Sequence, residues 1–276
     1  MTEIDKMTGL LKLLKVVDLI FEVVDARCPN TSRSKQVRNL IKGKRSLLVL
    51  NKTDLADPRV TGDWVSYYTS QEEKVLPVDA LRGGGMSRVR EVLDQEADAL
   101  NTVLRQKGRR NRALRTAVLG IPNTGKSSFL NQLIGKRKVL RGDRPGVTRG
   151  AQWVHVRGTI SILDTPGMLS PHIKDEDALF MLAVIRALDP ESIDPIDLGE
   201  KMLNFLQEHY RDNILKYLGL LEDTSLTLTS LARAKGFLIA DGEYDLQRAA
   251  VFLLAACSKG RLGRISLEVP TISCSY

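Results

Sequence analysis

The sequence contains few of the residues that build disulfide frameworks or zinc centres. It has 276 residues but only three cysteines, Cys28, Cys257 and Cys274, and three scattered histidines. No Cys-x-x-Cys pair is present, and no histidine stands at the spacing of a zinc site. We therefore expect reduced, structural thiols and no zinc centre.

Long apolar runs are also missing. The two longest cover residues 16–26, where acidic residues interrupt the run, and residues 249–257. Both are shorter than the roughly 20 residues that a membrane-spanning helix needs. The first residues lack the basic and apolar regions of a secretory signal. The sequence thus predicts a cytoplasmic protein with no membrane partner, and it leaves open whether that compartment belongs to a bacterium or an organelle.

Aromatic residues make up only 5% of the chain, whereas basic residues are abundant and unevenly placed. The net charge is +8, and residues 1–178 hold 31 Lys and Arg against 20 Asp and Glu. Residues 179–276 hold 10 against 13. Two basic clusters, at 105–112 and 136–144, are either solvated loops or contacts to the phosphates of a polyanion. Because aromatic residues do not interleave with them, stacking on single-stranded bases is not expected.

Apolar and amphipathic segments alternate over the first part of the chain. Short β-branched runs predict strands, and the segments between them have helical spacing. The predicted strands cover residues 19–24, 46–50, 74–78, 115–119, 152–156 and 159–163, and the predicted helices cover 34–41, 59–69, 89–104 and 126–133. This alternation predicts an α/β domain with a mainly parallel sheet between helices, and with ligands at the carboxyl ends of the strands.

From residue 175 onwards the pattern is helical only. Pro190 and Pro195 lie at the entry to this region, and prolines commonly punctuate such boundaries. We therefore predict two domains: an α/β domain over residues 1–174 and a small all-α domain over residues 175–276.

Residues Gly120 to Ser127 match the phosphate-loop pattern G-x-x-x-x-G-K-[ST], after a predicted strand and before a predicted helix. Glycines let the backbone curl so that its N–H groups point at phosphates, at the N-terminus of a helix whose dipole favours negative charge. Lys126 is expected to reach the β and γ phosphates. The candidate phosphate-binding residues here are Asn123, Thr124, Gly125, Lys126, Ser127 and Ser128.

Asn51-Lys52-Thr53-Asp54 follows another predicted strand. The Asp54 carboxylate can accept two hydrogen bonds from the ring N–H and the amino group of guanine, which adenine does not offer in that arrangement. Asn51 is expected to brace the loop and Lys52 to cover the ring. Asp79-Ala80 ends the next strand, where the Ala80 N–H is expected to meet guanine O6.

A third set of residues is suited to magnesium. Asp164-Thr165-Pro166-Gly167 follows a predicted strand, and Thr148 lies between the phosphate loop and the next strand. Hydroxyl and carboxylate oxygens are the ligands that Mg²⁺ prefers. We predict that Ser127, Thr148 and Asp164 hold Mg²⁺ and that the Gly167 N–H senses the γ phosphate.

The base-reading pair precedes the phosphate and magnesium set, although an ordinary small GTPase begins with its phosphate loop. If the five GTPase motifs are numbered G1 to G5 in their usual order, the order here is G4-G5-G1-G2-G3. With this order and several local motifs, the chain resembles the circularly permuted ribosome-biogenesis GTPases of the RbgA (YlqF) type. The further matching segments are Val24-Asp25-Ala26-Arg27, Gly142 to Thr148 and Gly263 to Glu268. The resemblance implies a cytoplasmic GTPase that binds GTP and GDP, acts late in assembly of the large ribosomal subunit and contacts rRNA through its helical domain.

The resemblance also suggests a role for Asn123, because potassium-stimulated relatives hold a monovalent cation with an asparagine there. A cation would supply charge that an arginine finger supplies elsewhere. A purely loop-shaping asparagine is the alternative. Met168 stands where many GTPases place a water-orienting glutamine. The resemblance implies a histidine near the N-terminus in its place, but no histidine precedes His155 in this sequence. The water-activating residue is therefore unknown.

The leading hypothesis is therefore a slow GTPase switch stimulated by the ribosome, in a chain expected to be a monomer. The first alternative is a GTP-gated RNA-binding scaffold that does not hydrolyse. A second alternative, an ATPase module, rests on the phosphate loop alone.

Overall fold

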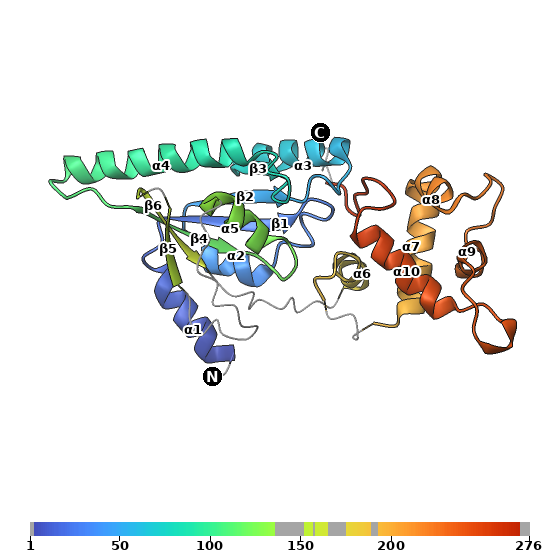
Figure 1. The fold of residues 1–276 in the computed structure, drawn as a ribbon. Coiled ribbons are helices and arrows are strands. Elements are labelled where there is room, and N and C mark those ends of the chain that lie inside the picture. Colours follow the sequence, from blue (N-terminus) through green and yellow to red (C-terminus); the bar gives the residue numbers. More distant parts are fainter. Residues whose placement is uncertain (1–2, 136–151, 157, 165–174, 189–192, 271–276) are drawn as a thin grey trace, which may run out of the picture.

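The chain folds into an α/β part and a helical part that lie side by side (Figure 1). The computed structural model describes residues 3–135, 152–156, 158–164, 175–188 and 193–270. Within these residues no helix is long and apolar enough to cross a membrane.

The α/β part contains a six-stranded sheet with the strand order β3-β2-β1-β4-β6-β5. Strand β5 is antiparallel to β6, and the other neighbouring pairs are parallel. The predicted mainly parallel sheet is thus confirmed. The strands are β1 Leu19–Asp25, β2 Ser46–Asn51, β3 Val75–Val78, β4 Leu114–Leu119, β5 Gln152–Val156 and β6 Ile160–Asp164.

Helices cover both faces of the sheet because successive strand residues point to opposite sides. Phe21 and Val23 pack in one core with residues of α4 and α5, whereas Ile20 packs on the other face with residues of α1 and α2. Val24 lies on that second face, in a core with residues of α3. The helices are α1 Glu3–Leu14, α2 Lys35–Ile41, α3 Pro58–Ser70, α4 Met86–Gln106 and α5 Lys126–Ile134.

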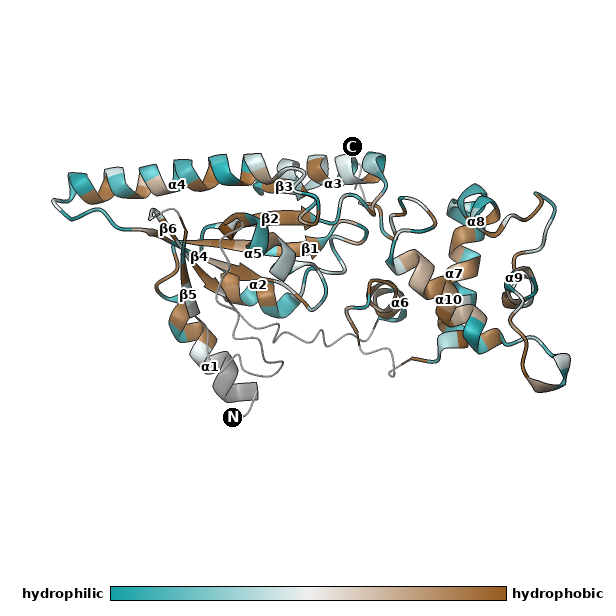
Figure 2. Cartoon of the chain, viewed as in Figure 1, coloured by the Kyte–Doolittle hydropathy of each residue, from teal (hydrophilic) through white to brown (hydrophobic). Residues whose placement is uncertain are grey.

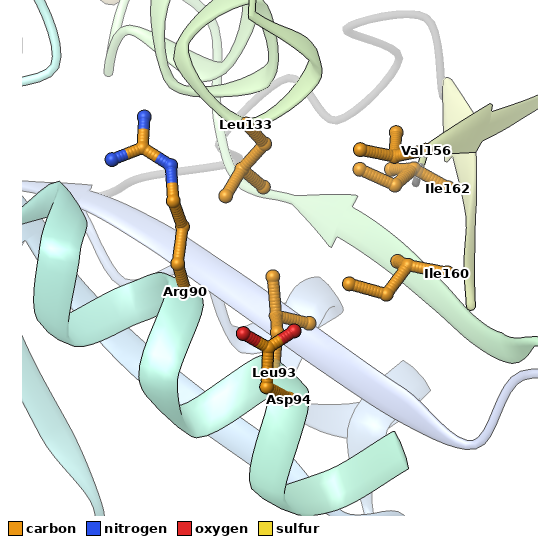
Figure 3. Close-up of a pocket in the computed structure, with 7 residues that line it drawn as sticks. All are labelled: Arg90, Leu93, Asp94, Leu133, Val156, Ile160 and Ile162. Atoms are coloured by element: carbon orange, nitrogen blue, oxygen red, sulfur yellow. The ribbon is translucent and has the colours of Figure 1, made fainter. Parts of the chain in front are cut away.

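Helix α4 runs along the sheet and continues past its edge, which leaves its last turns in solvent (Figures 1 and 2). It begins after Gly85, where φ is +76° and an added Cβ would lie 2.3 Å from the Pro77 carbonyl oxygen. Only glycine tolerates both conditions. A gap of about 10 Å³ lies beneath the helix, with room for about one water. Figure 3 shows the residues that line it. Its lining is Arg90, Leu93, Asp94, Leu133, Val156, Ile160 and Ile162.

The helical part has its own apolar core, to which Met202, Leu206, Leu231 and Leu253 contribute. Its helices are α6 Glu176–Val184, α7 Pro195–His209, α8 Arg211–Leu218, α9 Leu228–Lys235 and α10 Leu246–Ser258, with a 3-10 turn at Ala240–Gly242. Helices α7 and α10 approach closely at Gly199, where an added Cβ would lie 2.7 Å from the Ala250 Cβ. The predicted boundary between residues 174 and 175 stays a prediction.

The two parts share buried residues. Cys28 and Ile121 come from loops of the α/β part but pack in the apolar cluster of the helices. Cys28 and Cys257 are buried free thiols, and burial raises the pKa of Cys257 to about 12. Cys274 lies outside the described residues.

Candidate nucleotide-binding site

Neighbouring strands deliver the predicted motifs to one edge of the sheet. Asn51 ends β2, the phosphate loop follows β4, and β1 lies between these two strands and ends at Asp25. Because the three strands are parallel, their carboxyl ends meet at the same edge. Motifs that are about 70 residues apart in sequence, such as Asn51 and Thr124, are therefore neighbours.

The phosphate loop packs tightly against the strand beside it. An added Cβ at Gly120 would lie 2.2 Å from the Val23 carbonyl oxygen. The Thr124 hydroxyl donates to the Ile121 carbonyl at 3.1 Å, and the Lys126 ammonium donates to the same oxygen at 2.5 Å. Helix α5 begins at Lys126, so its free N–H groups and the positive end of its dipole face the loop. This is the arrangement that binds phosphate groups.

Lys126 titrates unusually in this environment. Burial, and secondarily the positive charge of Lys52, lower the pKa of the Lys126 ammonium to about 8. Two ammonium groups that converge on one loop make an anion a favourable neighbour. The ammonium groups of Lys126 and Lys52 therefore favour the binding of phosphate oxygens at this loop.

Asn51 joins the predicted base-reading loop to the phosphate loop. Its Nδ2 donates to the Thr124 carbonyl at 2.8 Å, and its Oδ1 accepts from the Ala80 N–H at 3.1 Å. Asn51 is 1% exposed, so both contacts are shielded from water. Gly125 allows the approach, because an added Cβ would lie 2.2 Å from Asn51 Nδ2. One side chain thus fixes three loops relative to one another.

Asp79 shapes its own loop. Its Oδ1 accepts from the N–H groups of Leu81 and Arg82, each at 3.0 Å. The carboxylate therefore performs the turn-capping role that short polar side chains have in such loops. The Ala80 N–H is directed at Asn51 Oδ1, so a guanine O6 would share this donor with Asn51.

Asp54 lies close to an arginine that the sequence did not single out. Arg82 Nη1 is 3.4 Å from Asp54 Oδ2 and 3.8 Å from Asp79 Oδ2. The arginine side chain is 69% exposed, whereas that of Asp54 is 8% exposed. Thr53 continues the loop and donates from its N–H to the Val78 carbonyl at 3.2 Å. Arg82 thus sits at the outer side of the predicted guanine-binding carboxylate.

Behind Lys52 lies a buried network. Asp25 Oδ2 is 2.9 Å from Lys52 Nζ and 2.9 Å from Arg27 Nη2. Burial raises the pKa of the Asp25 carboxyl, but the charges of Arg27 and Lys52 outweigh this and hold the pKa well below its usual range. Lys52 also donates to the Asn123 carbonyl. The motif Val24-Asp25-Ala26-Arg27 was the only sequence signal for this network.

Arg27 extends the network into the helical part. Its Nη1 donates to the carbonyls of Cys257 at 3.4 Å and Ser258 at 3.3 Å, at the end of α10. Its own carbonyl accepts from the Leu267 N–H at 2.7 Å. Arg27 is 3% exposed. Arg27, which shares the Asp25 carboxylate with Lys52, therefore holds two segments of the helical part.

Residues 263–268 return to the α/β part and lie on the loops after β1 and β2. The Ile265 N–H donates to the Leu55 carbonyl at 2.9 Å, directly after the base-reading motif. The Glu268 carboxylate accepts from the N–H groups of Asn30 at 2.9 Å and Thr31 at 3.2 Å. Trp64 Nε1 donates to the Glu268 carbonyl at 3.1 Å. This end segment braces the base-reading side of the site.

Asn123 connects the phosphate loop to α6. It adopts φ of +60°, which asparagine tolerates better than most residues. Its Nδ2 donates to the carbonyl of Arg186, which also has a positive φ, two residues after the end of α6. The phosphate loop therefore contacts the helical part through one exposed side chain as well as through buried Ile121.

Part of the predicted magnesium set can be placed. Ser127 lies in the first turn of α5, and the backbone of Asp164 ends β6, the strand beside β4. Ser128 follows in the same turn. Hydroxyl and carboxylate donors at these positions suit Mg²⁺ next to phosphates. Thr148, Gly167, Met168, the side chain of Asp164 and the basic cluster at 136–144 lie outside the described residues.

Comparison with known proteins agrees with this geometry. A family model described as "50S ribosome-binding GTPase" matches residues 115–218. A "Ribosome biogenesis GTPase A" from Priestia megaterium is 34% identical over 266 residues, which cover 94% of this chain and 91% of the relative. A protein of the same name from Thermotoga maritima is 31% identical and covers 94% of this chain, with 88% of the relative covered.

Solved structures are similar as well. A GDP-bound structure of T. maritima YlqF has a TM-score of 0.68 at 28% identity, with 95% of this chain and 98% of that chain covered. A GNP-bound structure of the same protein has a TM-score of 0.67 at 28% identity, with 96% and 98% covered. The similarity thus extends over both the α/β part and the helices.

Proposed function

Since the chain belongs to the ribosome biogenesis GTPase A family, it is a GTPase that acts in ribosome biogenesis, and we propose that it serves as a slow switch in late assembly of the large ribosomal subunit. In this proposal GTP favours attachment to the subunit and its rRNA, and hydrolysis favours release. The names of the relatives favour this function over a non-hydrolysing scaffold. We propose that the protein acts as a monomer in the cytoplasm.

The observation that carries the proposal is the position of Asn51. It binds the phosphate loop through Thr124 and the Ala80 loop through its other amide atom. A nucleotide whose phosphates lie on Lys126 and the α5 N-terminus would then present its base towards the Asn51 to Asp54 loop. Asp54 would accept from the guanine ring N–H and amino group, and the Lys52 stem would cover the ring.

Mg²⁺ would be held by Ser127, Thr148 and Asp164, and it would neutralise charge on the β and γ phosphates. Around it, Lys126 and the N–H groups of the loop would orient the phosphates, and the Gly167 N–H would sense the γ phosphate. We further propose K⁺ beside Asn123. The Asn123 amide nitrogen is committed to Arg186, which leaves its oxygen for the cation.

The output of the switch would be the helical part. In the sequence α6 is the next helix after the segment with Asp164 and Gly167, and Asn123 contacts Arg186, just after α6. Release of a nucleotide-ordered segment on γ-phosphate loss is a common way in which GTPases change the position of a neighbouring element. Hydrolysis would therefore alter the contact that Asn123 and Ile121 make with the helices.

GTP turnover in four conditions tests the proposal: with and without large ribosomal subunits, in K⁺ and in Na⁺. We expect stimulation by subunits, and more of it in K⁺. An Asp54→Asn variant should lose the preference for GTP over other nucleotides while it keeps its fold, with an Asp63→Asn variant as the matched control on α3. No stimulation in any condition would reject the catalytic part of the proposal.

A further inference from the structure

The structure carries an exposed basic surface at the amino-terminal edge of the sheet, opposite the nucleotide site. We propose that this surface binds the phosphate backbone of structured RNA, independently of base sequence. The proposal rests on the proposed function for the identity of the polyanion. We call the surface the basic edge and define it by Lys42, Arg45, Lys107, Arg109, Arg110 and Arg115.

Two chain segments, residues 42–45 and 107–115, bring the basic edge together. The Ile20 N–H donates to the Arg45 carbonyl at 2.9 Å, and the Asp18 N–H donates to the Arg115 carbonyl at 2.8 Å. Arg45 and Arg115 therefore flank the start of β1 on its two sides. Neighbouring strands are roughly 4.8 Å apart, so the two backbones are separated by about two strand spacings, or ~10 Å. Two exposed cationic residues thus lie at one end of the sheet.

The segment that leads to Arg115 follows α4, which projects past the sheet at this same end (Figure 1). The Arg112 guanidinium binds Asp18 at 2.7 Å, and the Arg112 N–H donates to Asn101 Oδ1 at 3.0 Å. These bonds tie the segment to the start of β1 and to α4. Lys107, Arg109 and Arg110 are presented from this anchored loop, so their charge is added to that of Arg45 and Arg115.

Carboxylates neutralise little of this charge. Glu96 binds Arg45 at 2.6 Å, and Asp18 is taken by Arg112. The remaining members of the basic edge form no ion pair within the described part of the chain, and every member is exposed. Residues 105–115 contain six Lys and Arg and no acidic residue, and residues 42–45 contain three and none. Figure 2 shows this end of α4 and the following loop as largely hydrophilic.

A helix C-terminus favours nearby cations, which accounts for Arg105 and Lys107 at the end of α4. That effect falls off within the last turn. It does not account for Arg109 and Arg110, which follow the helix, or for Arg45, which precedes β2, and Arg115 in β4. The accumulation of charge across two segments therefore needs another explanation.

Phosphate groups of RNA fit the surface best. Residues 1–178 are net basic while residues 179–276 are net acidic, so the net positive charge that attracts a polyanion lies in the first 178 residues. No aromatic residue lies in 35–45 or 105–115, so stacking on unpaired bases is not supported. Backbone contacts without base reading are what Lys and Arg alone provide.

A charge-neutral variant, Lys107→Gln with Arg109→Gln and Arg110→Gln, tests the proposal. The matched control is Lys35→Gln with Arg59→Gln and Arg88→Gln, which removes the same charge from exposed positions elsewhere on the α/β part. Binding of both proteins to an rRNA-derived double-stranded hairpin and to large ribosomal subunits is measured over a series of KCl concentrations. GTP affinity and basal turnover are measured alongside.

We expect the basic-edge variant to bind both RNA probes roughly 10-fold or more weakly at moderate salt. Its log affinity against log salt should lose a slope of about 2 to 3, since each phosphate contact contributes about 0.9. The control should change little, and both proteins should bind and hydrolyse GTP normally. Equal losses in the two variants, or no loss in either, would overturn the proposal even if subunits still stimulate GTP turnover. The same two variants are also tested for binding to anionic phospholipid vesicles. If the basic-edge variant binds the vesicles more weakly but both RNA probes normally, the proposal is overturned in favour of a membrane surface.

Discussion

The Lys52 ammonium lies 2.9 Å from the Asp25 carboxylate, which is completely buried at the end of the neighbouring strand. The lysine of the base-reading motif is therefore positioned from within the sheet. The same carboxylate binds Arg27, and Arg27 binds carbonyls at the end of α10. A single charged group thus connects the candidate guanine-binding loop to the helical part, which is a physical route by which nucleotide state and helix position can influence each other.

Replacing Asp25 by asparagine should strongly destabilise the fold. The change leaves Arg27 buried without its counter-charge, and breaking one side of a buried pair typically costs about 3–5 kcal/mol. Denaturant unfolding of the nucleotide-free protein measures this. The control is Asp18→Asn, whose partner Arg112 is 36% exposed, so its loss should be about 1 kcal/mol or less. Similar losses for both variants would contradict the assignment.

The stability that Asp25 contributes should depend on acidity in a defined direction. Its folded-state pKa lies below the unfolded value of about 3.9. The contribution is therefore complete above that value and falls as the pH drops towards the folded pKa. The difference in unfolding free energy between the wild type and Asp25→Asn should be constant from pH 7 to about pH 5 and shrink below about pH 4. If this difference in unfolding free energy increases as the pH falls, the predicted direction of the Asp25 pKa shift is wrong.

Nucleotide binding should take up protons at alkaline pH through Lys126. Its pKa of about 8 in the free protein must rise when phosphate oxygens lie beside it, because nearby negative charge favours the protonated form. GDP affinity should therefore fall as the pH rises above about 8. Calorimetry at pH 8.5 in two buffers of different ionisation enthalpy measures the uptake. A Lys126→Arg variant should show none, because arginine stays charged.

A comparison of Gly125→Ala with Gly135→Ala should separate the stability cost of a strained backbone from a loss of nucleotide affinity. At Gly125 φ is +90° and the new Cβ would lie 2.2 Å from Asn51 Nδ2, so Asn51 must move. We expect guanine-nucleotide affinity to fall by about 10-fold or more. Gly135→Ala has a φ of +75° with open space around it, and should cost only about 1 kcal/mol of stability. Equal nucleotide affinity in the two variants would mean that Asn51 does not set the site.

The sequence predicted much of the α/β part because its signals are local. The apolar run before Asn51 and the loop from Gly120 each lie within a few residues, and the structure brings the end of the first and the start of the second to the same sheet edge. Helix α1 was not predicted. Its sequence contains Gly9, and Leu10 and Leu14 are the buried residues of its described side chains, so its periodicity is weak.

The sequence by itself determined which loops are the candidates for nucleotide binding, because glycine, lysine and carboxylate patterns act over a few residues of backbone. Tertiary structure alone decided how those loops are held. Arg27 meets Cys257 and Ser258 across about 230 residues of chain, and Glu268 meets Asn30 across 238. Side chains contact one another only over a few ångströms, so these contacts form only when packing brings distant segments together. Such pairs leave no periodic pattern in the sequence.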